Sequence, residues 1–421
     1  MRDERRLIEW GKDALIALLT LSALWLLTMT PLVRDSGLQE LLRPKESPGV
    51  GSSGGAAGTA MLPARLAVTG EGGRLGVQYD EERLEEVFPP LGALLGDALA
   101  SAGQPEAISE EEWQRRLGRR GVYFDFAGEA PLSALERWLQ GPGDTELTGC
   151  ARRLLLCGGE GDQVLLCWRE GGSGQFYSCS TGLTQALHLE PATEGIDFNG
   201  AYFAFESGAL SQVLDPYTLV TEGEQSGAGY TVSVPLAAEE ERLAVLSALS
   251  FNSQNPAPVN GGQVYLDGGD RLTVGAGGSV SYRAARGEKY PAGPSLADGV
   301  EASWALAEGA LGPLCGEARL YLVSVEEAGG ALRVSFGYLL DGCTVQLGGQ
   351  GWAAQFLIRD GYITQFTLRF RSYAAAGERT LLLPMDKAAV MLPDLSAGRR
   401  ELVVQYLDGG GTEVFPQWVA E

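Results

Sequence analysis

Histidine is almost absent from this chain, because His188 is the only one among 421 residues. A single histidine excludes a metal site built from several histidines, and any Ser-His-Asp triad would depend on this one side chain. His188 lies in the stretch ALHLEP, which is typical of a surface or strand residue. No segment has the glycine and lysine spacing of a P-loop. These absences point away from catalysis.

Cysteine is also scarce, with six in the chain and no Cys-x-x-Cys pair, so we predict no zinc site. Cys150, Cys157, Cys167 and Cys179 cluster in the sequence. A hairpin of residues 151–157 and 163–169 would place Cys157 opposite Gln163, not opposite Cys167. We therefore expect reduced cysteines on strands, and a disulfide in another register stays open.

Positive charge is in deficit, with 32 basic and 54 acidic residues and a formal net charge of −22. Such a surface repels phosphate backbones, which excludes nucleic acid as a partner. The acidic runs 81–86, 110–112 and 239–241 each lie near an expected helix start, where they cap the helix. A glycosidase would need two acids across a cleft, which sequence spacing cannot show. We predict no cofactor and no metal.

One long run is both uncharged and strongly apolar, at residues 14–33 (ALIALLTLSALWLLTMTPLV). About twenty residues at about 1.5 Å each form a helix of about 30 Å, which is the thickness of a bilayer core. The sequence therefore predicts one transmembrane helix close to the N-terminus.

The flanks of this helix predict its orientation. Arg2, Arg5, Arg6 and Lys12 precede it, a slight excess of positive charge that favours a cytoplasmic N-terminus. The rival interpretation is a cleaved signal peptide, but the run is longer than a usual signal core. We expect an uncleaved single-pass protein of the cell membrane with an extracytoplasmic body.

The body has the pattern of an α+β protein with antiparallel sheets, because its 59 glycines and 20 prolines predict many turns. A helix after Asp80 is interrupted by Pro89 and Pro90, so we expect two short helices or a kinked one. Asp360 and Gly361, between two alternating runs, predict a type I′ hairpin. Further elements are expected as a helix from Ser109, a strand at 121–126, a meander at 151–205, a helix at 235–249, strands at 263–283, a helix at 299–309, a helix at 386–391 and two closing strands.

Composition shifts divide the chain into six parts. The segment 46–60 is rich in glycine, serine and alanine, as in flexible linkers. The predicted parts are a cytoplasmic tail (1–13), the transmembrane helix (14–33), the linker (34–60), an N-terminal α+β domain (61–206), a middle α+β domain (207–293) and a C-terminal α+β domain (294–421).

Several segments of the body resemble the YycH and YycI family. They are GVYFDF after the helix from Ser109, then VYLDG, LTV and VSY between 264 and 282, and finally FGYLLDG at 336–342, DGYI at 360–363 and FPQW at 415–418. The last three have the order of strand, hairpin and closing Pro-x-Trp in the domain that YycH and YycI share. The resemblance implies that residues 294–421 form a YycI-like domain.

The resemblance also implies a function. Members of this family are non-enzymatic regulators of an essential sensor histidine kinase, WalK (also called YycG), in low-GC Gram-positive bacteria. The implied partners are a sensor histidine kinase of a two-component system and a YycI-like single-pass protein, in a pathway of cell-wall metabolism. Small or polar residues on the predicted helix would form the partner interface, namely Ala17, Thr20, Ala23 and Thr28. The alternatives are an anchored envelope binding module and a wall-active hydrolase.

Overall fold

A computed structural model describes residues 62–139, 145–221, 225–252, 254, 256–259, 261–275, 277–348, 351–391 and 400–421. The chain divides into two compact units, 1–52 and 53–421, and every described residue belongs to the second unit. The predicted transmembrane helix lies outside the described residues. Within the described part, no helix is long and apolar enough to cross a membrane.

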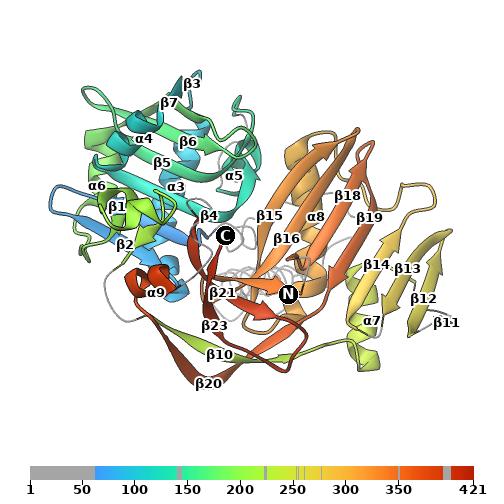
Figure 1. The fold of residues 1–421 in the computed structure, drawn as a ribbon. Coiled ribbons are helices and arrows are strands. Elements are labelled where there is room, and N and C mark those ends of the chain that lie inside the picture. Colours follow the sequence, from blue (N-terminus) through green and yellow to red (C-terminus); the bar gives the residue numbers. More distant parts are fainter. Residues whose placement is uncertain are drawn as a thin grey trace, which may run out of the picture. The chain divides into compact units, whose positions relative to one another are not determined.

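The first part of the body is a seven-stranded antiparallel sheet (Figure 1). Its central strands are the predicted meander, in which short apolar runs are separated by glycine-containing turns. The strands in spatial order are β2 (Arg74–Gln78), β1 (Arg65–Thr69), β4 (Gly121–Pro131), β5 (Cys150–Gly158), β6 (Gln163–Glu170), β7 (Phe176–Thr184) and β3 (Glu106–Ile108).

Both faces of this sheet are apolar, and each is covered by helices. Helices α3 (Glu81–Ala100) and α5 (Leu132–Trp138) pack against one face. Helix α4 (Glu110–Leu117) packs on the other face, where Trp113 and Leu117 are buried. Ser109 caps α4 as predicted, because its hydroxyl accepts a hydrogen bond from the backbone of Glu112.

Helix α3 decides between two expectations. It is one continuous helix through Pro89 and Pro90, so the expectation of two short helices is wrong. The carbonyls that lose a hydrogen bond to a proline belong to Glu85 and Glu86, four residues earlier. Both residues are exposed, so water satisfies these carbonyls and the helix continues.

The predicted hairpin of β5 and β6 forms in a different register. Cys157 pairs with Leu165, and Leu155 pairs with Cys167, so the expected pairing of Cys157 with Gln163 is wrong by two residues. The reason is a turn placed one residue further along the chain, since Gly158 pairs with Val164 and the Gly159 N–H donates a hydrogen bond to the Gln163 carbonyl. The shift keeps each side chain on its predicted face. All six cysteines are free thiols.

The second part of the body is a large sheet in which β17 and β21 are parallel and the other pairs are antiparallel. Its path is β11 (Ala257–Val259), β12 (Gly262–Asp267), β13 (Asp270–Gly275), β14 (Ser279–Arg283), β19 (Tyr362–Arg369), β18 (Ala354–Arg359), β16 (Ala331–Leu340), β17 (Cys343–Leu347), β21 (Leu402–Asp408) and β23 (Pro416–Ala420), and β15 (Arg319–Ala328) pairs with β16.

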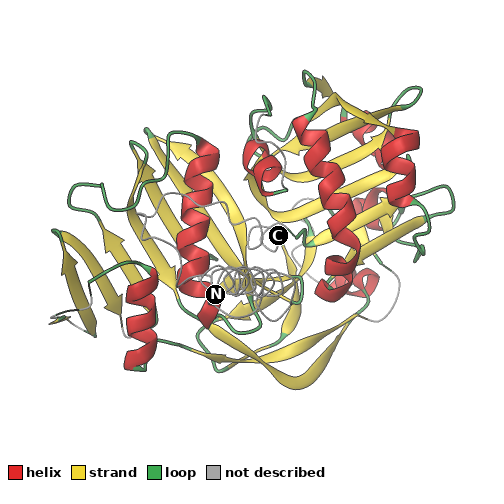
Figure 2. Cartoon of the chain, turned by 180° about the vertical axis from the view of Figure 1, so that it is seen from behind, coloured by secondary structure: helices red, strands yellow, loops and turns green. Residues whose placement is uncertain are grey.

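One face of the large sheet is covered by α8 (Leu296–Leu311), which contacts β16, β18 and β19 (Figure 2). Helix α7 (Glu239–Ala248) packs beside α8. The hairpin between β18 and β19 confirms the predicted type I′ turn, because Asp360 and Gly361 both have positive φ, of 50° and 75°.

A ribbon of β10 (Gln225–Ser233), β20 (Ser372–Leu382) and β22 (Glu413–Val414) forms a third sheet. The smaller elements are the π-helical turn η3 (Gln185–Leu189), α6 (Glu190–Thr193), β8 (Tyr202–Phe203), η4 (Ala204–Glu206), η5 (Leu210–Gln212), β9 (Leu219–Val220), η6 (Gly312–Leu314) and α9 (Met385–Met391). The end of the predicted meander at 151–205 is therefore a two-residue strand followed by a 3₁₀ turn.

Packing contacts join the two large sheets at α5 and at β4. Helix α5 packs against α8, where the Trp138 and Trp304 rings are 5.9 Å apart. Strand β4 bulges beyond Asp125 and lies against β15. Gly128 makes this approach possible, since a Cβ there would lie 2.0 Å from the Leu322 carbonyl oxygen.

The α+β class with antiparallel sheets and packed helices is thus confirmed for the described residues. The boundaries of the six predicted parts stay predictions. The strands at 262–283 join the same sheet as those at 319–369 through the pairing of β14 with β19.

Candidate functional site

The predicted partner interface of Ala17, Thr20, Ala23 and Thr28 lies outside the described residues and stays a prediction. The other sequence candidates have structural roles. His188 is half-buried in the turn η3, where its Nδ1 lies 3.1 Å from the backbone nitrogen of Thr184.

The acidic runs lie in the first turns of α3, α4 and α7, as predicted, and the run of α7 also caps its helix. In the first turn of α7, the Glu241 carboxylate accepts hydrogen bonds from the backbone of Leu236 and Ala238. Asp267 and Asp270 pair across a two-glycine turn, as expected of a hairpin. Among the residues that the structure describes, no three His, Cys, Asp or Glu side chains are grouped as metal ligands.

The most unusual feature of the body is a buried group of charges, which we call the arginine–carboxylate cluster. It contains three arginines and three carboxylates, from segments far apart in the sequence. Its members are Arg65, Asp125, Arg152, Arg153, Asp215 and Glu401.

Strand register positions the first half of this cluster. Arg65 on β1 pairs with Asp125 on β4, and Asp125 pairs in turn with Arg153 on β5. Arg169 on β6 extends the same row. Arg152 joins the cluster because the register shifts beside it, between Ala151 and Arg153.

Asp125 hydrogen-bonds to two arginines and lies 3.7 Å from the Nε of a third, Arg153. Its carboxylate accepts hydrogen bonds from Arg152, with Nε–Oδ1 at 2.7 Å and Nη2–Oδ2 at 3.0 Å. Arg65 Nη1 lies 3.1 Å from Asp125 Oδ2. The carboxylate also accepts a hydrogen bond from the backbone of Ala127, in the bulge that faces β15.

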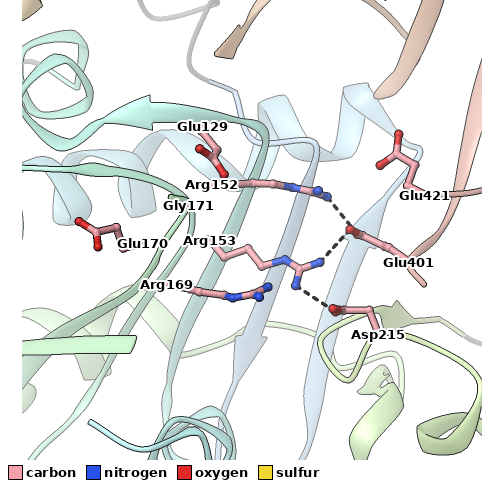
Figure 3. Close-up of a pocket in the computed structure, with 9 residues that line it drawn as sticks. All are labelled: Glu129, Arg152, Arg153, Arg169, Glu170, Gly171, Asp215, Glu401 and Glu421. Carbon is pink, nitrogen blue, oxygen red and sulfur yellow. Dashed lines mark hydrogen bonds and ion pairs between the residues drawn. The ribbon is translucent and has the colours of Figure 1, made fainter. Parts of the chain in front are cut away.

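Glu401 brings in the C-terminal part of the chain. It directly precedes β21, and its carboxylate lies 3.0 Å from Arg152 Nη2 and 2.8 Å from Arg153 Nη2. Arg65 also donates to it. Arg153 reaches Asp215 at 2.9 Å, as Figure 3 shows. The cluster therefore links the first sheet to the start of β21.

Electrostatics explain how these charges stay buried. Burial by itself raises the pKa of Glu401 and of Asp125, but the surrounding arginines outweigh it and hold both pKa values below the usual range. Burial by itself would likewise lower the pKa of Arg152. The carboxylates of Asp125 and Glu401 outweigh burial and raise that pKa above its usual value. The three positive and three negative charges of the cluster balance, so no net charge is buried.

A cavity of about 310 Å³ opens beside the cluster (Figure 3). Its lining is formed by Glu129, Arg152, Arg153, Arg169, Glu170, Gly171, Asp215, Glu401 and Glu421. Since most of its arginines are engaged by carboxylates, the arrangement suits mechanical coupling between segments better than acid–base chemistry.

The sequence contained two signals of this cluster. Asp125 stands between aromatic residues in GVYFDF, and a charge at a buried strand position needs a partner. The adjacent Arg152 and Arg153 in an apolar strand were a second signal. Nothing in the sequence indicated Glu401, which is 336 positions from Arg65.

The sequence matches no protein-family model and no curated protein, whereas the fold has a counterpart among solved structures. A solved structure of YycH from Bacillus subtilis is similar, with a TM-score of 0.56, 10% sequence identity, and coverage of 86% of this chain and 94% of that chain. The body has a YycH-like fold. The YycH-like architecture predicted from the sequence is confirmed at the level of fold.

A second solved structure, an uncharacterized protein from Eubacterium rectale ATCC 33656, has a TM-score of 0.31 and 9% identity, with coverage of 48% of this chain and 78% of that chain. This similarity is too low to carry a structural argument. The structural comparison therefore rests on the likeness to YycH, which concerns the fold.

Proposed function

We propose that this protein is a membrane-anchored regulator of a sensor histidine kinase, with its body outside the cytoplasm. The observation that carries the proposal is the YycH-like fold over 86% of the chain. The apolar run at residues 14–33 supports a membrane anchor. The role is non-catalytic, in a two-component pathway that controls cell-wall metabolism.

Regulation of this kind is a difference in binding. A protein shifts a two-state kinase only if it binds one state more tightly, and a difference of about 1–3 kcal/mol changes the output measurably. The anchor helix would contact a transmembrane helix of the kinase through Ala17, Thr20, Ala23 and Thr28. The body would add extracytoplasmic contacts, with a YycI-like protein as a second partner.

A rigid body is useful for this purpose. The arginine–carboxylate cluster joins the first sheet to β21, so a force on either part is carried to the other instead of being absorbed by a loop. Arg137 supports the same connection, since its Nη1 lies 2.6 Å from Asp298 at the start of α8.

The test replaces Ala17, Thr20, Ala23 and Thr28 by leucine and measures transcription of a gene controlled by the kinase. A matched control changes Leu18 and Leu26, on the opposite side of the predicted helix, to alanine. We expect altered output only for the first variant, with equal amounts of both proteins in the membrane. Normal output would refute the helix contact.

A crosslinking experiment tests the partner itself. The tagged full-length protein is crosslinked in native membranes, and co-purified proteins are identified by mass spectrometry. Enrichment of a sensor histidine kinase over a control that carries only the anchor helix supports the proposal. Recovery of wall-synthesis enzymes without a kinase would contradict it.

A further inference from the structure

The face of the large sheet opposite α8 carries a row of neutral polar side chains. Each is the register partner of the next on the adjacent strand, and none is charged. The row consists of Thr273, Ser281, Thr367, Gln355, Ser335 and Ser324, on β13, β14, β19, β18, β16 and β15.

Strand alternation explains why this face is polar. The residues next to the row, such as Phe336 and Phe356, turn to the other face and are fully buried. There Trp304 of α8 packs on Phe336 at 5.5 Å between ring centroids. The large apolar side chains of these central strands thus point to the covered face, and the row on the opposite face keeps hydroxyl and amide groups.

A groove of about 520 Å³ lies over one end of this row. Ser324, Ser335 and Gln355 line it on β15, β16 and β18. Thr344 and Gln405, which are register partners on β17 and β21, line it on the other side. We call this the polar groove. Its volume is within the range of small-molecule sites.

The polar groove is deeper than an ordinary solvated sheet face. Ser335 is only 3% exposed and Gln405 only 5%, although both are polar. Gln355 donates a hydrogen bond to the Ser335 hydroxyl at 3.2 Å, which fixes the amide. These groups are held in place before any ligand arrives, so little side-chain entropy is lost on binding.

Two aromatic rings also line the groove, from Trp352 and Tyr321. The Arg369 guanidinium lies 4.0 Å from the Trp352 ring centroid and holds the indole. The Tyr321 ring lies over Gly337, where a Cβ would be 2.5 Å from its Cε1. Glycine at that position therefore lets the ring lie flat on the sheet.

All four charged residues of the lining have protein partners, and three of them pair with an opposite charge. Arg65 and Arg152 belong to the arginine–carboxylate cluster. Glu326 pairs with Arg333 at 3.2 Å, and Glu421 accepts a hydrogen bond from the Gln405 amide. What remains for a ligand is a set of neutral hydroxyl and amide groups beside two aromatic rings.

One buried atom gives an independent indication of a ligand. Arg65 is 7% exposed, and its Nε–H has no hydrogen-bond partner within the described part of the chain. A buried donor without an acceptor is costly. An acceptor group on a ligand in the groove would satisfy it.

We propose that the polar groove binds an uncharged oligosaccharide. Sugar hydroxyls both donate and accept hydrogen bonds, as do the amide and hydroxyl side chains that line the groove. The apolar face of a sugar ring fits an aromatic ring such as that of Trp352. An anionic ligand is disfavoured by the net charge of −22. This proposal does not depend on a kinase partner, and it gives the body a ligand of its own.

The test measures binding to the purified full-length protein in detergent micelles by saturation-transfer difference NMR and calorimetry. The probes are cellotetraose and the tetramer of N-acetylglucosamine, both neutral, with tetragalacturonate as the anionic counterpart. We expect binding of at least one neutral probe and at least tenfold weaker binding of the anionic one.

Variants then locate the site. Trp352→Ala and Gln355→Ala should each weaken binding about tenfold, because each removes a main contact. Thr273→Ala is the matched control, since it belongs to the same row but lies outside the groove. It should bind within twofold of the original protein. Thermal unfolding confirms that each variant is folded.

Failure to bind either neutral probe, equal or tighter binding of tetragalacturonate, or unchanged affinity in both groove variants would each overturn the proposal. None of these results bears on the kinase, because the assay contains no other protein. Conversely, a failed kinase experiment leaves the groove proposal standing.

Discussion

Replacing Asp125 by alanine should lower the free energy of unfolding by about 3–5 kcal/mol, the usual cost of breaking a buried ion pair by removing one partner. Asp125 is 1% exposed, and its carboxylate contacts Arg65 and Arg152 and also accepts the backbone N–H of Ala127. Without it, three arginines share Glu401 and Asp215, which leaves buried positive charge uncompensated.

The size of this loss in unfolding free energy depends on burial, so it can be compared with the loss at an exposed ion pair. Arg83 and Glu86 form an ion pair one turn apart on α3, with side chains 39% and 67% exposed. Water screens such a pair, so Glu86→Ala should cost at most about 1 kcal/mol. The difference between the two variants isolates the contribution of burial.

The assay is equilibrium unfolding in urea at 25 °C, monitored by tryptophan fluorescence and circular dichroism. Fitted slopes that agree between variants show that only the free energy has changed. If Asp125→Ala costs no more than Glu86→Ala, the cluster is solvated, and our account of it is refuted. Asp125→Asn keeps the shape and separates the loss of charge from the cavity.

Three further predictions concern acid, a close backbone contact and a turn. The cluster should make the stability of the protein sensitive to acid. The folded-state pKa values of Asp125 and Glu401 lie below their ordinary values. Their contribution to the free energy of unfolding is therefore present above about pH 4 and is lost as the pH falls through the folded-state pKa values. Unfolding in urea at several pH values checks this. Gly128→Val should lower the free energy of unfolding by about 1–3 kcal/mol, measured in urea, because the valine Cβ would clash with the Leu322 carbonyl. Gly361→Ala should lower stability by about 1–2 kcal/mol, measured in the same way, because alanine is strained at a φ of 75°.

Each of these has a matched control. Glu401→Gln should reduce the loss of stability in acid, and an unchanged pH profile would contradict the assignment. Gly172→Ala should be nearly neutral, because nothing lies within 4 Å of a Cβ there. Gly309→Ala, on the exposed side of α8, should stabilise the protein by about 0.5–1 kcal/mol. A destabilising effect of similar size in either glycine control would show that the glycine arguments are wrong.

Much of the local structure could be predicted from the sequence. The Ser109 cap and the Asp360–Gly361 turn are decided by residues within a few positions of each other, where turn chemistry and capping act. The errors arose where local signals depend on the environment. Prolines 89 and 90 were tolerated because their freed carbonyls face solvent, and the register of Cys157 was decided by the turn that precedes β6.

The candidate sites depended on tertiary structure to different degrees. Asp125 could be suspected of burial from its apolar neighbours. The identity of its partners could not be predicted, because Arg65 and Glu401 meet it only through strand pairing and the return of the C-terminal segment. The polar groove was missed for the same reason: Ser335 and Gln355 are ordinary residues until register places them side by side.

By itself the sequence determined the α+β class, the position of most helices and turns, the apolar run at 14–33 and the likeness to YycH, because these depend on short-range periodicity, composition and turn residues. Only the tertiary structure decided the arginine–carboxylate cluster and the polar groove. Both are built from residues on different strands, and long-range pairing is set by the packing of the whole body rather than by any local stretch of the chain.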